Sequence, residues 1–211
     1  MCIATGRWKL FVAQPVVEVI PTWERPTPQF VDFFSGAELA ALDLGEAAVP
    51  ELVWSHKLAI IDGPVRKGAE VSAWVDCSEK TDRIYLNPYK CLKKSLEEWR
   101  RTLLHELGHI LTPTVDFSGP VTGHDFAFAV AFAACQVRIG FPLRLRAYDL
   151  SDIPPAERGR MTRRAEQLGE RFGSGPTDLF QIARLVSCIE VTAQREGWDH
   201  AMRAPKRFWL F

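Results

Sequence analysis

The sequence predicts an α+β protein in which a small, mostly antiparallel sheet packs on two helices, with further helices toward the C-terminal end. Three apolar runs rich in β-branched residues lie at 51–61, 69–77 and 82–87, and such runs are typical of strands. Apolar residues recur at helical spacing between 95 and 112, and residues 126–137 are almost all apolar, which indicates a helix buried on most sides. Hydrophobic residues make up 47% of the 211, which is enough for one compact core.

We expect the chain to divide into three parts. Residues 1–30 are predicted to form an extended arm with one strand at 9–20, because prolines interrupt any helix there. Residues 31–150 are predicted to form the main domain, and residues 151–211 a helical extension packed on it. A short helix is expected near the start of the main domain. Ser35 with Glu38 three residues later predicts a capping box, and Gly45 is the expected stop.

The three apolar runs are expected to form the sheet. Val71, Ala73 and Val75 alternate on one face of the second run, and Ile84 and Leu86 alternate in the third. Turn residues follow at 62–64 and 87–88. An edge strand of such a sheet can align an extended substrate. Either 51–58 or 69–77 could be that edge, and the sequence leaves the choice open.

The best-defined helix is predicted to begin at Ser95, which forms a second capping box with Glu98, and to end at Pro113. His105 and His109 are four residues apart, so both project from the same face of this helix. The apolar spacing predicts one buried stripe that holds the helix in the core. Its members are Leu96, Trp99, Leu103, Leu107 and Ile110.

A third histidine precedes the next predicted helix. Thr122 and Asp125 resemble a capping pair, which would place His124 in the first turn. The intervening loop, rich in proline and glycine, is long enough to bring the second helix back beside the first. Three histidines would then meet, and a catalytic zinc ion takes three protein ligands while one position stays open for water.

The stretch from His105 to His109, "HELGH", is the H-E-x-x-H motif of zinc metallopeptidases. Glu106 lies next to the first ligand, so it could act as the general base that takes a proton from a zinc-activated water. A more distant helical glutamate is an alternative third ligand, with Glu166 or Glu170 as candidates. Two core histidines held by hydrogen bonds would explain neither Glu106 nor His124.

Four segments resemble the SprT-like zinc metallopeptidase family, which includes the Spartan DNA-repair proteases. They occur in the family's order as "VWSHKL", "IYLNPYKCL", "TLLHELGH" and "GHDFAF", and the resemblance covers roughly residues 33–140. It implies a zincin-like core with His105, His109 and His124 as Zn²⁺ ligands and Glu106 as the base. The implied activity is a zinc-dependent endopeptidase that hydrolyses protein or peptide substrates, with DNA-associated proteins among the targets.

The chain also departs from the family. Asp125 stands where the family has a second glycine, and the cysteine-based zinc ribbon found in some members is absent from the sequence. Asp125 could support a ligand from behind the metal or simply begin the helix. Tyr148, which follows the zinc helices, is the leading candidate for a transition-state hydrogen-bond donor, with Tyr85 and Tyr89 as alternatives.

Charge and cysteine usage limit the other classes of function. The 26 basic and 26 acidic residues cancel, so net charge does not indicate DNA binding, although arginines between 138 and 171 could form a local phosphate-binding patch or a solvated helix face. The scattered cysteines and the short apolar run at 126–135 suggest a cytoplasmic protein with no membrane partner.

The aromatic end at 204–211 is expected to dock on the protein's own core. The alternative function is a non-proteolytic, zinc-stabilised binding or DNA-associated regulatory protein.

Overall fold

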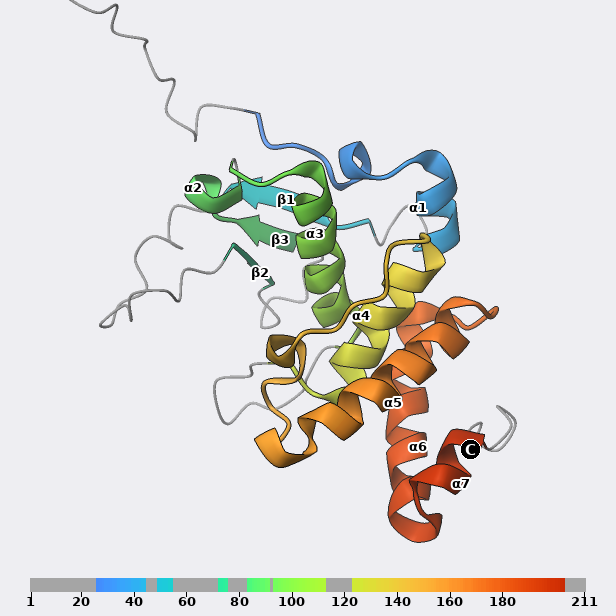
Figure 1. The fold of residues 1–211 in the computed structure, drawn as a ribbon. Coiled ribbons are helices and arrows are strands. Elements are labelled where there is room, and N and C mark those ends of the chain that lie inside the picture. Colours follow the sequence, from blue (N-terminus) through green and yellow to red (C-terminus); the bar gives the residue numbers. More distant parts are fainter. Residues whose placement is uncertain are drawn as a thin grey trace, which may run out of the picture.

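The computed structural model describes residues 26–44, 49–54, 72–75, 83–91, 93–112 and 123–203. These residues form an α+β fold, as predicted, with a small sheet at one end of a group of helices (Figure 1). Four predicted features lie outside the described residues: the arm before residue 26 with its strand, the turn at 62–64, the loop at 113–122 and the aromatic end at 204–211. No helix within the described ranges has the length and apolar character needed to cross a membrane.

The sheet contains three described strands, β1 (Glu51–Trp54), β2 (Ala73–Val75) and β3 (Arg83–Leu86), in the order β1-β3-β2. The β2–β3 pairing is antiparallel, but β1 runs parallel to β3. The prediction of a mostly antiparallel sheet is therefore wrong. Alternation of apolar residues identifies a strand and its buried face, whereas strand direction depends on a long connection that this pattern does not record.

Both predicted capping boxes are present. Ser35 begins α1 (Gly36–Leu42), which follows the 3-10 helix η2 (Phe30–Phe33), and the Ser35 side chain accepts a hydrogen bond from the Glu38 backbone N–H. This helix ends earlier than the expected stop at Gly45. Asp43 adopts a left-handed backbone conformation with φ of 52°, and this conformation ends a helix because it turns the chain away from the helix axis.

The helix that carries the H-E-x-x-H motif, α3 (Leu96–Leu111), begins at Ser95 as predicted, after the short helix α2 (Pro88–Cys91). Trp99, Leu103 and Leu107 form its buried stripe. Leu96 does not belong to this stripe, since it is 61% exposed. It lies in the first turn, beyond the edge of the surface that α3 packs against, so the spacing rule extended the stripe by one residue too many.

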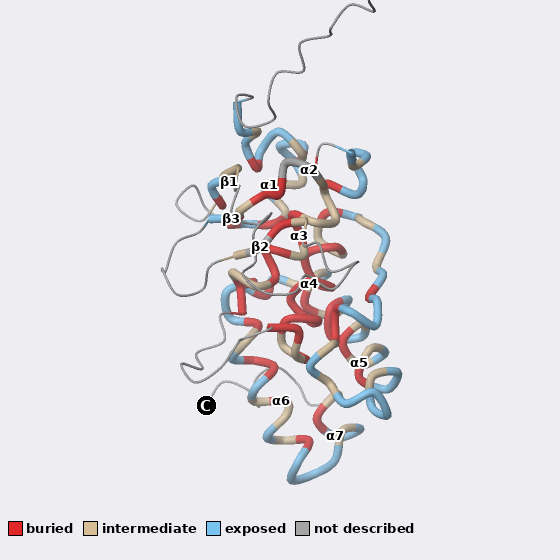
Figure 2. The backbone as a smooth tube through the Cα atoms, turned by 90° about the vertical axis from the view of Figure 1, so that its left-hand side faces the viewer, coloured by how far each residue is buried: buried red, intermediate tan, exposed pale blue. Residues whose placement is uncertain are grey.

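The second buried helix, α4 (Phe126–Arg138), lies at the centre of the molecule. It packs against α3 on one side and against α5 (Pro155–Gly173) and α6 (Ile182–Glu196) on the other (Figures 1 and 2). The 3-10 helix η5 (Ala147–Leu150) lies between α4 and α5 in the chain, and η6 (Leu179–Gln181) lies between α5 and α6. The last described helix, α7 (Trp198–Arg203), packs on α6. The C-terminal helices therefore complete the same hydrophobic core.

Candidate metal centre

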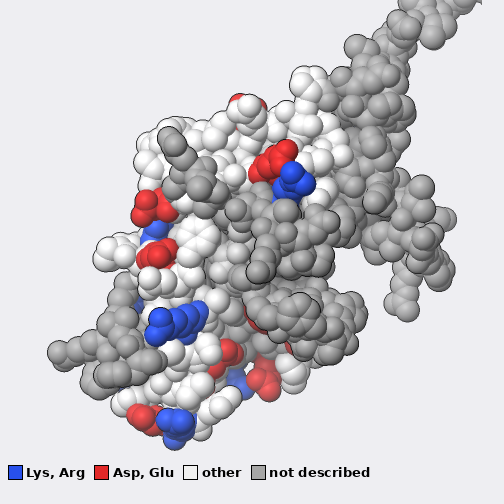
Figure 3. Space-filling model, turned by 180° about the vertical axis from the view of Figure 1, so that it is seen from behind, with Lys and Arg blue, Asp and Glu red and all other residues white. Residues whose placement is uncertain are grey.

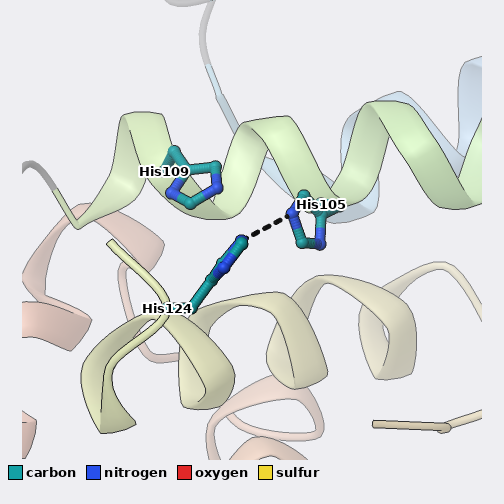
Figure 4. A group of neighbouring side chains, drawn as sticks. All are labelled: His105, His109 and His124. Carbon is teal, nitrogen blue, oxygen red and sulfur yellow. Dashed lines mark hydrogen bonds between the residues drawn. The ribbon is translucent and has the colours of Figure 1, made fainter. Parts of the chain in front are cut away.

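Helix α3 presents His105 and His109 from one face, with ring centroids 5.1 Å apart. The opposite side of this helix is held by leucines in the core, including Leu103 and Leu107 at 0% exposure. A fixed helix separates the two imidazoles by about one turn and directs both toward α4 (Figure 4). The local sequence pattern therefore sets two members of the site before any long-range contact is considered.

His124 approaches the pair from the segment just before α4 (Figure 4). It precedes the first turn rather than lying in it, because the N-cap is Asp125, whose Oδ1 accepts a 2.8 Å hydrogen bond from the Phe128 backbone N–H. The expected capping partner Thr122 lies outside the described residues. The backbone N–H of His124 donates a 3.0 Å hydrogen bond to Asp152 Oδ2, which anchors the segment to the chain beyond η5.

The three histidines form a group that could hold a metal ion. One ring nitrogen from each lies within 4.8 Å of the others, and the Nε2 atoms of His105 and His124 are 3.1 Å apart. Metal–nitrogen distances of about 2.0–2.1 Å in a tetrahedral site would place such nitrogens roughly 3.3 Å apart, so the 3.1 Å between these two Nε2 atoms fits one shared ion. The alternative ligands on α5, Glu166 and Glu170, do not belong to this group.

Asp149 and Ser151 determine which ring nitrogens face the centre, and the sequence analysis identified neither. Asp149 Oδ1 lies 3.2 Å from Nδ1 of His105, and a carboxylate can only accept, so Nδ1 carries the proton and Nε2 keeps a lone pair. Ser151 Oγ lies 3.1 Å from Nδ1 of His124 and donates its own proton to Asp152 Oδ1 at 3.4 Å. In the tautomer in which Nδ1 donates to this hydroxyl, Nε2 of His124 keeps a lone pair as well.

The donor set therefore fits a cation. In the tautomers in which both Nδ1 atoms carry the proton, two Nε2 lone pairs face each other at 3.1 Å, and a positive ion between them satisfies both. The partners on the far side of each ring, a carboxylate for His105 and a hydroxyl for His124, are the kind that orient metal-binding histidines and raise their basicity. The residues present thus match a three-histidine metal site.

Two phenylalanine rings of α4 pack against the histidines of this centre. The Phe128 ring stacks on His109 with centroids 4.3 Å apart, and Phe132 meets His105 edge-on at 5.4 Å. Burial lowers the pKa of His109 to about 2 and that of His124 to about 4, with the neighbouring His105 contributing in both cases. Both side chains are therefore neutral near pH 7, which is the form that binds metal.

Glu106 lies beside the histidines on a cavity of about 310 Å³, which is also lined by His105 and Tyr148. Its side chain is buried, and burial raises the pKa of the carboxyl above its usual value, while His105 and Lys94 act in the opposite direction. Carboxyl groups with a pKa raised toward neutrality are suited to proton transfer. Ala73 of β2 also lines the cavity, so of the two outer described strands, β2 is the one beside the site.

The two remaining predicted site residues occupy different positions. Tyr148 lies in η5, is 60% exposed, and places its ring 4.4 Å from the ring of His124. Burial of its inner part raises the pKa of its hydroxyl, as do the charges of Glu106 and Asp149. Asp125 begins α4, which is the simpler of the two roles considered for it.

Three of the arginines considered as a phosphate-binding patch bond to backbone carbonyls. Arg138 donates to Gly175 and Thr177, Arg158 to Ser151 and Ile153, and Arg171 to Met202. On the face drawn in Figure 3, the described basic and acidic side chains form small separate groups. Among the described residues on that face, the basic side chains therefore form no continuous surface.

Comparisons of the whole chain with models of protein families, with curated proteins and with solved structures each returned no match. The candidate metal centre is therefore supported by the geometry of its own residues.

Proposed function

We propose that the protein is a zinc-dependent endopeptidase of the SprT-like kind, with a zincin-like core. The observation that carries the proposal is a group of three histidines of which one, His105, lines the same cavity as the buried Glu106. His105, His109 and His124 supply the nitrogen ligands, and Glu106 faces the same cavity as His105. This is the combination that the H-E-x-x-H motif requires.

His105, His109 and His124 would hold the zinc ion, which supplies Lewis-acid activation of a water molecule and of a peptide carbonyl when bound. Glu106 would take the proton from that water and return it to the leaving amine, since its carboxyl group is beside the cavity and its raised pKa favours both steps. Tyr148 would donate a hydrogen bond to the developing oxyanion, and the closeness of its ring to that of His124, 4.4 Å between centroids, supports this role. The outer strand β2 would pair with an extended substrate.

The test of mechanism is Glu106→Gln in the metal-loaded protein. Glutamine has nearly the same shape, so we expect unchanged folding and metal content but a loss of peptide hydrolysis of about a hundredfold or more, the usual contribution of a general base. Cleavage of an unfolded protein, with and without DNA, gives the rate. A variant that cuts as fast as wild type would rule out Glu106 as the base even if proteolysis were established.

The test of the ligand set is His124→Ala. Two histidines leave zinc short of ligands, so we expect the variant to lose the single bound zinc ion at concentrations that saturate wild type. Metal analysis after desalting measures the stoichiometry, and His200→Ala is the matched control because His200 lies on α7 and pairs with Glu196. Full retention of zinc by His124→Ala would contradict the three-histidine site.

A non-proteolytic, zinc-stabilised binding or DNA-associated regulatory protein is the competing function. It would need the metal for stability alone, and it gives no reason for a buried glutamate to face an accessible cavity. Zinc-loaded wild-type protein that cuts no unfolded protein, with or without DNA, would favour this competing function.

A further inference from the structure

The cavity beside His105 and Glu106 has a second chemical character that the proposed mechanism does not use. Three cationic side chains line it: Lys94, Arg101 and Arg146. They come from three places, the segment before α3, the helix itself and the chain before η5. The described acidic residues in the lining are Glu106 and Asp149. The lining thus holds more cationic than acidic side chains, in the same cavity as the residues proposed to act on the scissile bond.

Arg101 is occupied, but the other two cations have capacity to bind a ligand. Arg101 lies 3.6 Å from Asp149, donates to the Arg144 carbonyl and stacks over Phe132. The Lys94 ammonium group donates to Thr102 Oγ1, which uses one of its three protons.

Arg146 is exposed and makes no ion pair with another residue of the described ranges. Its charge contributes, after burial, to lowering the pKa of both Lys94 and Arg101. Glu98 does not line the cavity; it interacts electrostatically with Lys94 and Arg146, but its carboxylate is hydrogen-bonded to Ser95 in the helix cap.

We propose that Lys94 and Arg146 form an anion subsite that binds a carboxylate of the peptide substrate close to the scissile bond. Like charges around a shared cavity repel one another, and an anion between them relieves that repulsion. Arginine and lysine are the side chains that bind carboxylates through charge-assisted hydrogen bonds. This proposal rests on the proposed peptidase function, which defines the substrate as a peptide. It adds that the enzyme prefers acidic peptides. The carboxylate is either an aspartate or glutamate side chain or the C-terminal group of the substrate.

The test measures kcat/KM for a series of peptides that carry no charge except one glutamate, whose position differs from peptide to peptide. Each is compared with the same peptide carrying glutamine at that position. Each peptide is made with a free and with an amidated C-terminus, which separates the two sources of carboxylate. Zinc-loaded wild type should show a kcat/KM about tenfold higher for glutamate at one position, or for the free C-terminus. Arg146→Gln should remove most of this preference while leaving the uncharged peptides unaffected. Lys94→Gln should also remove most of it, measured as the ratio of kcat/KM for each glutamate peptide to that for its glutamine counterpart, because the Lys94 charge also acts on the pKa of Glu106.

The matched control is Arg144→Gln. It removes the same charge from the same segment, but Arg144 does not line the cavity, and its hydrogen bond with Arg101 is made by its backbone carbonyl. The acidic preference of this variant should stay within about twofold of wild type. Equal loss of preference in Arg144→Gln and Arg146→Gln would overturn the subsite in favour of a diffuse positive field.

Binding separates this proposal from the peptidase function. Rhodamine-labelled glutamate and glutamine peptides are titrated with zinc-loaded Glu106→Gln, and fluorescence anisotropy reports affinity without turnover. Tighter binding of the acidic peptide that depends on Arg146, with no cleavage by wild type, supports the subsite and rejects the peptidase. Cleavage by wild type with equal binding of both peptides rejects the subsite alone. Displacement of the acidic peptide by a single-stranded oligonucleotide at lower concentration than by the unlabelled peptide would assign the cations to a phosphate backbone and overturn the proposal.

Discussion

Asp149 acts on the candidate site through one atom of one ring. Its carboxylate lies 3.2 Å from Nδ1 of His105, accepts a 2.7 Å hydrogen bond from the Arg146 backbone N–H and lies 3.6 Å from the Arg101 guanidinium. Hydrogen bonds from His105 and Arg146 lower the pKa of Asp149 although its burial acts in the opposite direction. An ionised acceptor behind the ring fixes the tautomer and makes Nε2 a stronger ligand.

We therefore expect Asp149→Asn to weaken zinc binding by about tenfold to a hundredfold, the usual effect of removing a partner of this kind. Asparagine has nearly the same shape, so the fold should survive, but its single oxygen can accept from only one of the two donors, His105 Nδ1 and the Arg146 N–H. Competition with a chromophoric chelator measures the affinity. Asp43→Asn is the control, because the exposed Asp43 has a left-handed backbone that asparagine tolerates. Equal affinities in the two variants would show that the Asp149 charge does not support the site.

The sequence was sufficient for the residues that lie close together along the chain. His105, Glu106 and His109 share one helix turn, and His124 begins the segment before the next helix, so spacing alone could group them. Asp149, Ser151 and Asp152 could not be found in this way. They reach the histidines through η5 and the chain after it, and no local pattern records a contact that depends on how that segment folds back.

The same distinction holds for whole elements. Ser35 and Ser95 begin helices where predicted, because a capping box is complete within four residues. The start of α5 at Pro155 also follows from local chemistry, because the fixed φ of proline suits the first position of a helix. The direction of β1 relative to β3 was not predicted correctly, because that pairing depends on contacts between residues far apart in sequence. Local chemistry set the ends of the elements, and tertiary packing set their neighbours.

Helices α4 and α5 approach so closely that a single methyl group should disturb them. A Cβ atom added at Gly169 would lie 2.3 Å from Cβ of Ala133 and 3.1 Å from its backbone carbonyl carbon. Alanine normally favours a helix over glycine by about 1 kcal/mol. Here the overlap with backbone atoms should outweigh this gain, so we expect Gly169→Ala to destabilise the protein by about 1–3 kcal/mol.

Gly159→Ala provides the control on the same helix, because nothing lies within 4 Å of the Cβ it would add. This variant should be as stable as wild type or more stable by up to about 1 kcal/mol. Urea unfolding of both variants measures the difference. If Gly169→Ala proved as stable as Gly159→Ala, α5 would have to move away from α4 at no cost, and the close packing of the two helices would not be a source of stability.

At the scale of the whole molecule, the metal centre joins α3 to the segment that begins α4, and α4 contacts α5 and α6 in turn. Protons that compete for the histidines therefore act on the stability of the entire core. In the folded protein without metal, the pKa of His109 lies near 2 and that of His124 near 4, below the ordinary value of 6.5. The unfolded chain accepts these protons below about pH 6.5, and the folded chain does not.

Because unfolding takes up protons in this range, the contribution of these two histidines to stability is complete above pH 6.5 and falls as the pH decreases toward 4. Buried carboxyls with a raised pKa, Glu106 among them, act in the opposite direction over part of the range. A comparison with the double variant His109→Gln/His124→Gln removes their contribution, since it is common to both proteins.

We predict that, without metal, the free energy of unfolding of wild type relative to this double variant is constant above pH 7 and declines between pH 6.5 and 5, with a slope of up to two protons. Urea unfolding of chelator-treated protein at pH 7.5, 6 and 5 provides the measurement. A difference that stays constant over the whole range would mean that the histidines protonate in the folded core as readily as in the unfolded chain. His109 and His124 would then not be held neutral by burial in the metal-free site.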